Sequence, residues 1–197
     1  MTRIALSRFA AMGLAIACAV AATPASAQFF PFFGTPQSNY SGGGYGRYYG
    51  GGPIPREVVN FPGHHKPGTI IVNTSEYRLY LVTGNGQAIR YAVGVGREGF
   101  GWHGVHRIVA KREWPDWTPP KDMLRRRPDL PRHMDGGEAN PLGARAMYIG
   151  GTLYRIHGSN EPESIGHAVS SGCIRLVNED AIDLYNRVPV GATVIVR

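Results

Sequence analysis

The chain has 197 residues, of which 43% are hydrophobic and 18% charged, and its formal net charge is +7. This length suits one ordinary domain with flanking segments, and the positive charge suits an anionic surface. The basic residues are scattered along the sequence, whereas nucleic-acid-binding proteins gather them on one stripe or face, so we expect no nucleic-acid partner.

The first 27 residues have the three parts of a secretory signal peptide. Arg3 and Arg8 supply positive charge, the apolar run 9–22 follows, and the small-x-small sequence 25–27 offers a cleavage site. The apolar run is shorter than the roughly 18 to 20 residues that span a bilayer. We therefore expect residues 1–27 to be a signal peptide and the mature protein to be soluble and exported.

Export leaves a single cysteine. Cleavage after residue 27 would remove Cys18 and keep Cys173 in a mature chain of 170 residues. A lone thiol in an oxidising compartment cannot form an internal disulfide and is open to oxidation, so reactive chemistry is the first role to consider for Cys173. Lipidation of Cys18 stays an alternative, because Ala15-Ile16-Ala17 before it loosely resembles a lipoprotein cleavage site without the usual leucine.

Two regions follow the signal peptide. Residues 28–67 are rich in Gly, Tyr and Pro and poor in aliphatic side chains. Such a stretch cannot bury enough apolar surface to offset the entropy lost on ordering. We expect a disordered linker over residues 28–67 and one folded domain over residues 68–197.

The folded domain is expected to be mainly β. From Thr69 the sequence changes to short runs of Val, Ile and Tyr that are separated by turn residues. The first three runs, with the turn Gly84-Asn85-Gly86 before the third, predict an antiparallel meander. The expected strands are 69–72, 77–82, 87–95, 105–111, 146–149, 153–157 and 193–196.

One helix is strongly indicated near the C-terminus. Asn178 is a favourable N-cap residue, and Glu179 and Asp180 place negative charge in the first turn. Apolar side chains then recur at helical spacing from Ala181 to Val188. We expect a short helix that begins at Asn178 and packs its apolar stripe on the sheet.

A long excursion separates the two halves of the domain. Five prolines between Trp114 and Asn140 are expected to exclude regular structure there. Connections of this length are usually lids or binding elements. Trp102, Trp114 and Trp117 are interpreted as core or lid aromatics rather than as platforms for sugar rings.

The segment 170–176 places a thiol beside a cation. Read as extended chain, it puts Ile174 and Leu176 on the core face and Cys173 and Arg175 on the opposite face. A nearby guanidinium favours the thiolate form of cysteine, and neighbouring backbone N–H groups are suited to an oxyanion. Cys173 is therefore a candidate nucleophile.

A histidine lies sixteen residues upstream of the cysteine. His157 ends a run in which Tyr154 and Ile156 alternate with it, so its side chain leaves the strand on the polar face, directly before Gly158. This spacing allows a Cys–His pair. Spacing alone does not decide for catalysis, because a lone cysteine is more often a small buried hydrophobe and a lone histidine a solvated side chain.

The wider segment is more specific. Ile156-His157-Gly158-Ser159-Asn160, followed by Ser170-Ser171-Gly172-Cys173-Ile174-Arg175, resembles the L,D-transpeptidase signature, a His-Gly turn followed by Ser-x-Gly-Cys-x-Arg. The resemblance to L,D-transpeptidase catalytic domains of the YkuD and ErfK type covers roughly residues 68–197. It implies a β-sandwich fold with one short helix after the cysteine segment.

The resemblance also implies roles for the residues of the motif. By position, Cys173 corresponds to the nucleophile, His157 to the base, and the Gly158 carbonyl to the group that orients the imidazole. The backbone N–H groups of Ser171, Gly172 and Cys173 correspond to the oxyanion hole.

Two further positions are expected to bind substrate. Arg175 and Ser170 flank the cysteine in the same segment and are assigned to substrate binding. Ser171 departs from the pattern, because many relatives have histidine there. That histidine is not the base in the family scheme, so its replacement by Ser171 is expected to affect the fine tuning of the site and not the presence of activity.

The implied reaction acts on peptidoglycan stem peptides. Cys173 would attack the carbonyl between a diamino acid and the terminal D-residue of a tetrapeptide, release D-alanine and form a thioester. An amine of a second stem would then give a 3–3 crosslink, and an amine of an envelope protein would anchor that protein. Water as acceptor would make the enzyme an L,D-carboxypeptidase, and a non-catalytic peptidoglycan-binding module is the alternative of a different class.

The same reading gives the expected setting of the protein. With the signal peptide, the resemblance implies a monomer secreted to the bacterial cell envelope, in the periplasm. We expect no cofactor and no metal, since no His-Glu-x-x-His motif occurs among the seven histidines, and His103 and His106 would face opposite sides of a strand. The histidines are at positions 64, 65, 103, 106, 133, 157 and 167.

Overall fold

The structure is a computed structural model that describes residues 54–197. The predicted signal peptide, residues 1–27, and residues 28–53 of the predicted linker lie outside the described residues. No helix within residues 54–197 is long and apolar enough to cross a membrane. The described elements are β1 (Glu57–Asn60), β2 (Ile70–Asn73), β3 (Arg78–Gly84), β4 (Gln87–Ala92), β5 (Val95–Gly96), β6 (Gly104–Glu113), α1 (Lys121–Arg126), β7 (Arg145–Ile149), β8 (Arg155–His157), a 3₁₀ turn (Pro162–Ser164), β9 (Ala168–Ser170), β10 (Ile174–Arg175), α2 (Asn178–Arg187) and β11 (Thr193–Val196).

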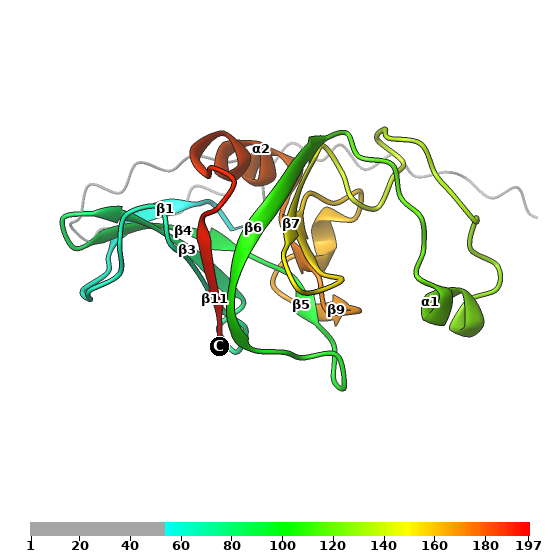
Figure 1. Ribbon diagram of the computed structural model, residues 1–197, viewed down its shortest axis with the longest axis horizontal. Helices are drawn as coiled ribbons and strands as arrows, with labels where there is room; N and C mark the ends of the chain where they lie inside the picture. Colours follow the sequence, from blue (N-terminus) through cyan, green and yellow to red (C-terminus); the bar gives the residue numbers. More distant parts are fainter. Residues whose placement is uncertain (1–53) are drawn as a thin grey trace, which may run out of the picture. The chain divides into compact units, whose positions relative to one another are not determined.

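Nine of these strands form one mixed sheet that folds over on itself. Their order is β1-β4-β3-β2-β11-β6-β7-β8-β10 (Figure 1). Strand β6 belongs to both halves, because its first residues pair with β11 and its last residues with β7. The register shifts between Ile108 and Ala110, and such an irregularity lets a strand bend. The expectation of a mainly β, sandwich-like fold is confirmed.

The hydrophobic core lies between the two halves. One cluster of buried side chains contains Ile70 and Leu79 from the half before β6, and Met147, Ile156 and Ile174 from the half after it. These side chains are at most 1% exposed. The same cluster includes Leu184 of α2, so the helix completes the core that the two half-sheets enclose.

The predicted meander is present. Strands β2, β3 and β4 are antiparallel neighbours in sequence order. Asn85 and Gly86, at the tip of the β3–β4 hairpin, have φ angles of 54° and 70°. Two successive positive φ values are typical of the tight hairpin turn for which an Asn-Gly pair is suited. The turn residues therefore set both the position of this hairpin and its register.

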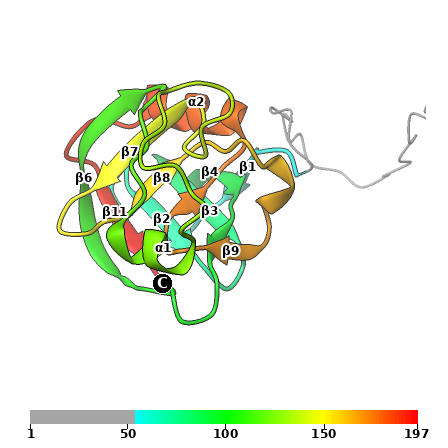
Figure 2. The same ribbon diagram turned by 90° about the vertical axis from the view of Figure 1, so that its right-hand side faces the viewer.

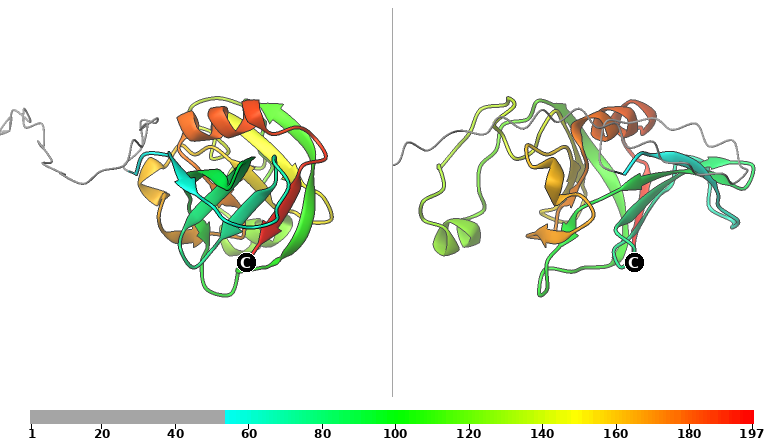
Figure 3. Two further views of the ribbon diagram at one scale, coloured as in Figure 1. Left: turned by 90° about the vertical axis from the view of Figure 1, so that its left-hand side faces the viewer. Right: turned by 180° about the vertical axis from the view of Figure 1, so that it is seen from behind.

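Strand β1 lies in the segment that was predicted to be linker. Glu57 to Asn60 pair antiparallel with β4, from Arg90 to Gln87 (Figure 3). Arg56, directly before the strand, donates to Asp180 of α2 at 2.7 Å. The linker prediction over residues 28–67 therefore extends too far, because a strand of four residues is too short to give a clear pattern in the sequence.

Helix α2 begins where the sequence predicts but is capped differently. Its N-cap residue is Val177, and Asn178 is the first helical residue rather than the cap. The Asn178 side chain is engaged elsewhere, because its Oδ1 accepts a hydrogen bond from the Ala144 N–H at 2.9 Å. The prediction of Asn178 as N-cap is therefore wrong, although Ala181 and Leu184 are buried as its apolar pattern indicates.

The proline-rich excursion contains a short helix, which corrects the expectation that it lacks regular structure. Helix α1 starts directly after Pro120 and ends before Pro128. The prolines therefore flank the helix, where a missing N–H costs no internal hydrogen bond. In Figure 2 α1 lies in front of the sheet, at the far end of the arm formed by residues 114–140.

A single buried amide ties the two ends of this arm together. Asn140 is 1% exposed, and its Nδ2 donates to the carbonyls of Pro115, Met134 and Asp135 at 3.1, 3.3 and 3.0 Å. Its Oδ1 accepts from the Leu142 N–H at 2.9 Å. Buried backbone groups need partners, so Asn140 supplies the bonds that regular structure would otherwise supply.

We expect the substitution Asn140→Ala to lower the stability by about 2 to 3 kcal/mol, because the carbonyls of Pro115 and Asp135 lose their donor and the Leu142 N–H loses its acceptor. For a domain of this size that corresponds to a fall of roughly 4 to 12 °C in Tm, measured by circular dichroism. Asn160→Ala is the matched control, since Asn160 is exposed and makes one such bond, to Ala139 at 3.0 Å. Equal Tm values for the two variants would contradict this role for Asn140.

Candidate active site

Parallel pairing of β8 with β10 brings the two halves of the motif together. Ile174 pairs with Ile156, and Arg175 pairs with His157. Cys173 directly precedes Ile174, so it comes next to Arg155 across the pair. The cysteine and the histidine therefore reach the same edge of the sheet although sixteen residues separate them in sequence.

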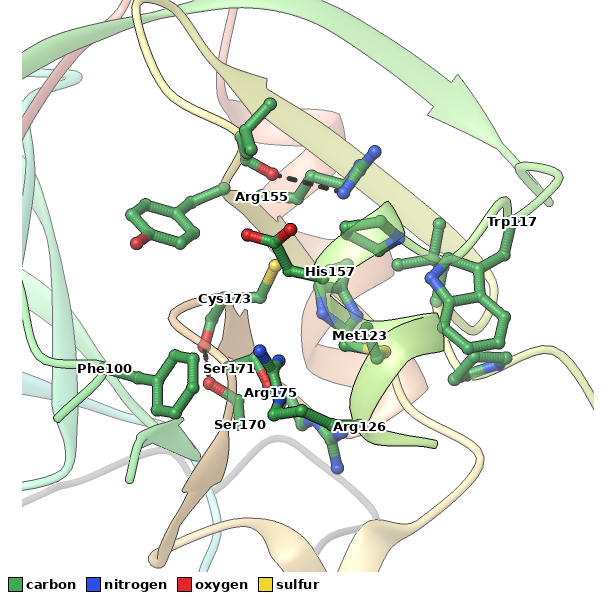
Figure 4. A pocket seen from close by; sticks show the side chains of 16 residues that line it. Phe100, Trp117, Met123, Arg126, Arg155, His157, Ser170, Ser171, Cys173 and Arg175 are labelled. Atoms are coloured by element: carbon green, nitrogen blue, oxygen red, sulfur yellow. Dashed lines mark hydrogen bonds between the residues drawn. The ribbon is translucent and has the colours of Figure 1, made fainter. Parts of the chain in front are cut away.

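Both side chains line one cavity of about 220 Å³ (Figure 4). Its floor comes from β8 and the cysteine segment, and one wall comes from the arm that carries α1. The lining residues are Phe100, Trp117, Pro120, Asp122, Met123, Arg126, Pro141, Leu142, Leu153, Tyr154, Arg155, His157, Ser170, Ser171, Cys173 and Arg175. Three arginines among them make the cavity predominantly cationic.

His157 is fixed in one tautomer. Its ring is 3% exposed, and its Nδ1 lies 2.5 Å from the Gly158 carbonyl oxygen. A carbonyl can only accept, so the proton sits on Nδ1 and Nε2 keeps its lone pair. A side chain at Gly158 would meet Asn178 Oδ1 at 2.2 Å, which explains why the residue that orients the imidazole is glycine.

Burial keeps His157 neutral. Removal from water lowers the pKa of His157 from 6.5 to about 3. The carbonyls of Gly158 and Leu142 favour the charged ring, and the guanidinium groups of Arg175 and Arg155 oppose it. The net effect is a strong preference for free imidazole, the form that can accept a proton.

Burial also dominates at Cys173: the neighbouring guanidinium groups favour the thiolate, as expected, but burial outweighs their effect. Removal from water raises the pKa of Cys173 above its ordinary 9.0. Hydrogen bonding and charge from Arg155, and a smaller contribution from Arg175, act in the opposite direction and do not offset it. The resting pair is therefore a neutral thiol beside a neutral imidazole.

The turn before the cysteine is held by its own serine. Ser170 is 2% exposed; its hydroxyl donates to the Cys173 carbonyl at 2.6 Å and accepts from the Gly172 N–H at 3.1 Å. Ser170 was expected to bind substrate, but its hydroxyl is already used inside the turn. It lines the cavity and shapes it.

The same bonds reduce the number of N–H groups that can form the expected oxyanion hole. The Gly172 N–H is already bonded to Ser170, so it is not available to an oxyanion. The N–H groups of Ser171 and Cys173 donate to no other group within residues 54–197. The Ser171 hydroxyl lies 3.4 Å from Arg97 Nη1 and faces the cavity. The N–H groups of Ser171 and Cys173 are therefore the donors of the expected oxyanion hole that remain available.

Two arginines of the site differ in how they are used. Arg175 lines the cavity and donates to Glu161 at 2.7 Å, so part of its charge is balanced. Arg155 also lines the cavity and is the first polar partner of the thiol, a role that the sequence analysis did not assign. The sequence did hold a signal for this role, because Arg155 lies two residues before His157 in the strand and therefore on the same face.

Two of the three tryptophans, Trp102 and Trp117, fit their interpretation as core and lid aromatics, and Trp114 is not in the core. Trp117 lines the cavity from the arm, and Trp102 packs against the main core cluster outside the cavity. Trp114 is 44% exposed and lies outside the cavity.

Comparison with known proteins decides the family. The model of the L,D-transpeptidase catalytic domain, YkuD, matches residues 67–196. The chain belongs to this family. The match begins within one residue of the predicted start of the domain at residue 68, and includes His157, Gly158 and the segment 170–176.

Individual relatives agree with this assignment over part of their length. The chain is 37% identical over 150 residues to the probable L,D-transpeptidase ErfK/SrfK of Escherichia coli, a match that covers 72% of this chain and 47% of that protein. The chain therefore spans about half the length of the curated relatives it matches.

Solved structures share the fold of this L,D-transpeptidase domain. L,D-transpeptidase 3 from Mycobacterium tuberculosis, in complex with a faropenem-derived adduct, is 20% identical with a TM-score of 0.51, over 66% of this chain and 59% of that chain. A Brucella melitensis protein, described as a probable carnitine operon oxidoreductase, is 44% identical with a TM-score of 0.50, over 71% of this chain and 91% of that chain.

We expect the alkylation of Cys173 by iodoacetamide to accelerate with pH up to and beyond pH 9, because the reagent attacks thiolate and burial raises the pKa of this thiol. The rate is measured by mass spectrometry of the Cys173 peptide, which separates it from Cys18. The unfolded chain in denaturant, where the thiol has its ordinary pKa, is the control. A plateau below pH 9 in the folded protein would mean that an ion pair already exists at rest.

Proposed function

We propose that this protein is a cysteine L,D-transpeptidase that acts on peptidoglycan stem peptides through an acyl-enzyme on Cys173. The observation that carries the proposal is the presence of a thiol, a neutral imidazole of fixed tautomer and an unused backbone N–H at one cavity. Membership of the family supports the same assignment. In this proposal Cys173 is the nucleophile, His157 the base and Gly158 the residue that orients it.

The first half-reaction starts from neutral groups. As Cys173 Sγ attacks the stem carbonyl, the thiol proton passes to His157 Nε2 and the carbonyl oxygen becomes an oxyanion beside the Cys173 N–H. Collapse of the adduct breaks the C–N bond, and the amine of the leaving D-alanine takes the proton from His157. The products are free D-alanine and a thioester on Cys173.

The second half-reaction reverses these proton movements. The acceptor amine attacks the thioester and loses a proton to His157, which returns it to the leaving thiolate. A second stem as acceptor gives a 3–3 crosslink, an envelope protein becomes anchored to the wall, and water gives the carboxypeptidase reaction. The low pKa of His157 favours the second proton transfer of each half, because an imidazolium in this site is a strong acid toward the leaving group, and it opposes the first transfer, from the thiol or the acceptor amine.

The charge of the cavity supports an anionic donor. Arg126, Arg155 and Arg175 line it, with Asp122 as the one carboxylate among its lining residues. The tetrapeptide of the proposed reaction ends in the carboxylate of its terminal D-residue, and guanidinium groups bind carboxylates well. We retain Arg175 as a substrate-binding residue, and assign Ser170 to holding the turn. The proposed setting is the periplasm, after removal of residues 1–27.

The substitution Cys173→Ala is expected to abolish D-alanine release from a disaccharide tetrapeptide, since it removes the nucleophile and little packing. Release and crosslinked product are measured by mass spectrometry, which also tells transfer from hydrolysis. Circular dichroism should report an unchanged fold. Wild-type turnover in this variant would end the transpeptidase proposal, and retained peptidoglycan binding without turnover in the wild type would favour a binding module.

A carbapenem offers a second readout of the same substitution. Its strained amide presents a carbonyl to the same thiol, and a relative of the same fold carries a faropenem-derived adduct. The wild-type mass should rise by one adduct and the mass of Cys173→Ala should not. An adduct on both proteins would assign the reactive group elsewhere.

The choice of base is tested by comparing two histidines. His157→Gln is expected to lower the rate of D-alanine release by about 10² to 10⁴, the usual effect of losing a positioned base. His167→Gln should stay within about threefold of the wild type, because His167 is exposed and does not line the cavity. The reverse ranking would transfer the role of base to His167.

A further inference from the structure

A tryptophan from outside the cavity is bonded to the turn that carries the nucleophile. The indole N–H of Trp102 donates to the Gly172 carbonyl at 2.7 Å. Trp102 lies between β5 and β6, seventy residues from Gly172 in sequence, and is not among the residues that line the cavity. Its hydrogen bond therefore reaches the cysteine turn through the backbone of Gly172.

The bond acts on a particular peptide unit. The Gly172 carbonyl and the Cys173 N–H belong to the same peptide, which is planar and trans, so the two groups point in opposite directions. Holding the carbonyl toward Trp102 therefore aims the Cys173 N–H to the other side. Like the Ser171 N–H, this N–H remains available for an oxyanion, as no other group within residues 54–197 accepts from it.

This peptide unit needs such a restraint. Gly172 has a φ of 110°, a region that glycine enters readily and other residues rarely, so the flanking torsion is soft. Ser170 holds the Gly172 N–H and the Cys173 carbonyl, which belong to the two neighbouring peptide units. Trp102 supplies the hydrogen bond that holds the unit between them.

The indole is itself held rigidly. It stacks on Tyr154, with ring centroids 4.9 Å apart and planes 20° apart, and its contact with His106 is edge-on at 5.4 Å. Tyr154 also closes over the turn, because a side chain at Gly172 would meet its ring at 2.2 Å. A donor fixed by aromatic packing needs no reorganisation during the reaction.

We propose that Trp102 is a positioning residue for the oxyanion hole, and that its indole N–H orients the Cys173 N–H through the Gly172–Cys173 peptide. The inference rests on the proposed function, since an oxyanion forms only if Cys173 attacks a carbonyl. It gives Trp102 no contact with substrate and no part in proton transfer. Its predicted effect is confined to steps with a tetrahedral transition state.

Two reactions of the same thiol separate this role from a structural one. Acylation by a carbapenem develops an oxyanion, whereas alkylation by iodoacetamide is a displacement at carbon that develops none. Trp102→Phe keeps an aromatic ring against Tyr154 and removes the donor. We expect its acylation rate, and kcat for D-alanine release, to fall about 10- to 100-fold, somewhat less than direct removal of an oxyanion donor.

The other parameters should stay close to those of the wild type. Alkylation of Cys173 and KM for the tetrapeptide are expected to change by less than about twofold, because thiol and substrate contacts are intact. Trp114→Phe is the matched control, since it replaces the same side chain by the same residue at another position outside the cavity. It should leave acylation and alkylation unchanged.

Other results would contradict either this role of Trp102 or the proposed function. Acylation of Trp102→Phe at the wild-type rate, or equal losses in acylation and alkylation, would overturn the inference. A wild-type protein that is alkylated but never acylated would instead contradict the proposed function. If Trp102→Phe lacks a cooperative thermal transition, benzothienylalanine at position 102 keeps the bicyclic shape without the N–H, and the same two rates are compared.

Discussion

The site depends on one short parallel pairing. Two residues of β10 lie beside β8, and this pairing sets Cys173 next to the strand that ends in His157. Parallel strands require a crossover, and here the crossover is the segment with the 3₁₀ turn and β9. The core beneath includes Ile156 and Ile174, each at most 1% exposed, so the face of the pairing opposite the two reactive groups is sealed from water.

Burial sets the chemistry that this arrangement supports. The same exclusion of water lowers the pKa of His157 and raises the pKa of Cys173, so both groups are uncharged before substrate arrives. Charge then appears only during the reaction, next to backbone dipoles whose directions are already fixed. The arginines of the cavity are too weakly coupled to the thiol to reverse this order, and their charge is better suited to holding carboxylates.

The sequence predicted the features that local patterns carry. Asn85 and Gly86 located a hairpin, the motif around His157 and Cys173 located the site, and alternating residues located most strands. Strand β1, helix α1 and the parallel pairs were missed, because short elements and long-range contacts leave little periodicity. The dominance of burial at Cys173 and the bond from Trp102 to Gly172 could not be predicted either, since both depend on what surrounds a residue in space.

The two ends of the arm that carries α1 are held together by the buried amide of Asn140, and α1 itself buries none of its residues. Substitutions on α1 therefore carry little thermodynamic penalty for the sheet. They do change the wall of the cavity, which Met123 and Arg126 help to form. The lining of the cavity can thus change through substitutions in this one segment, while the strands that hold the thiol and the imidazole stay under the constraint of the core.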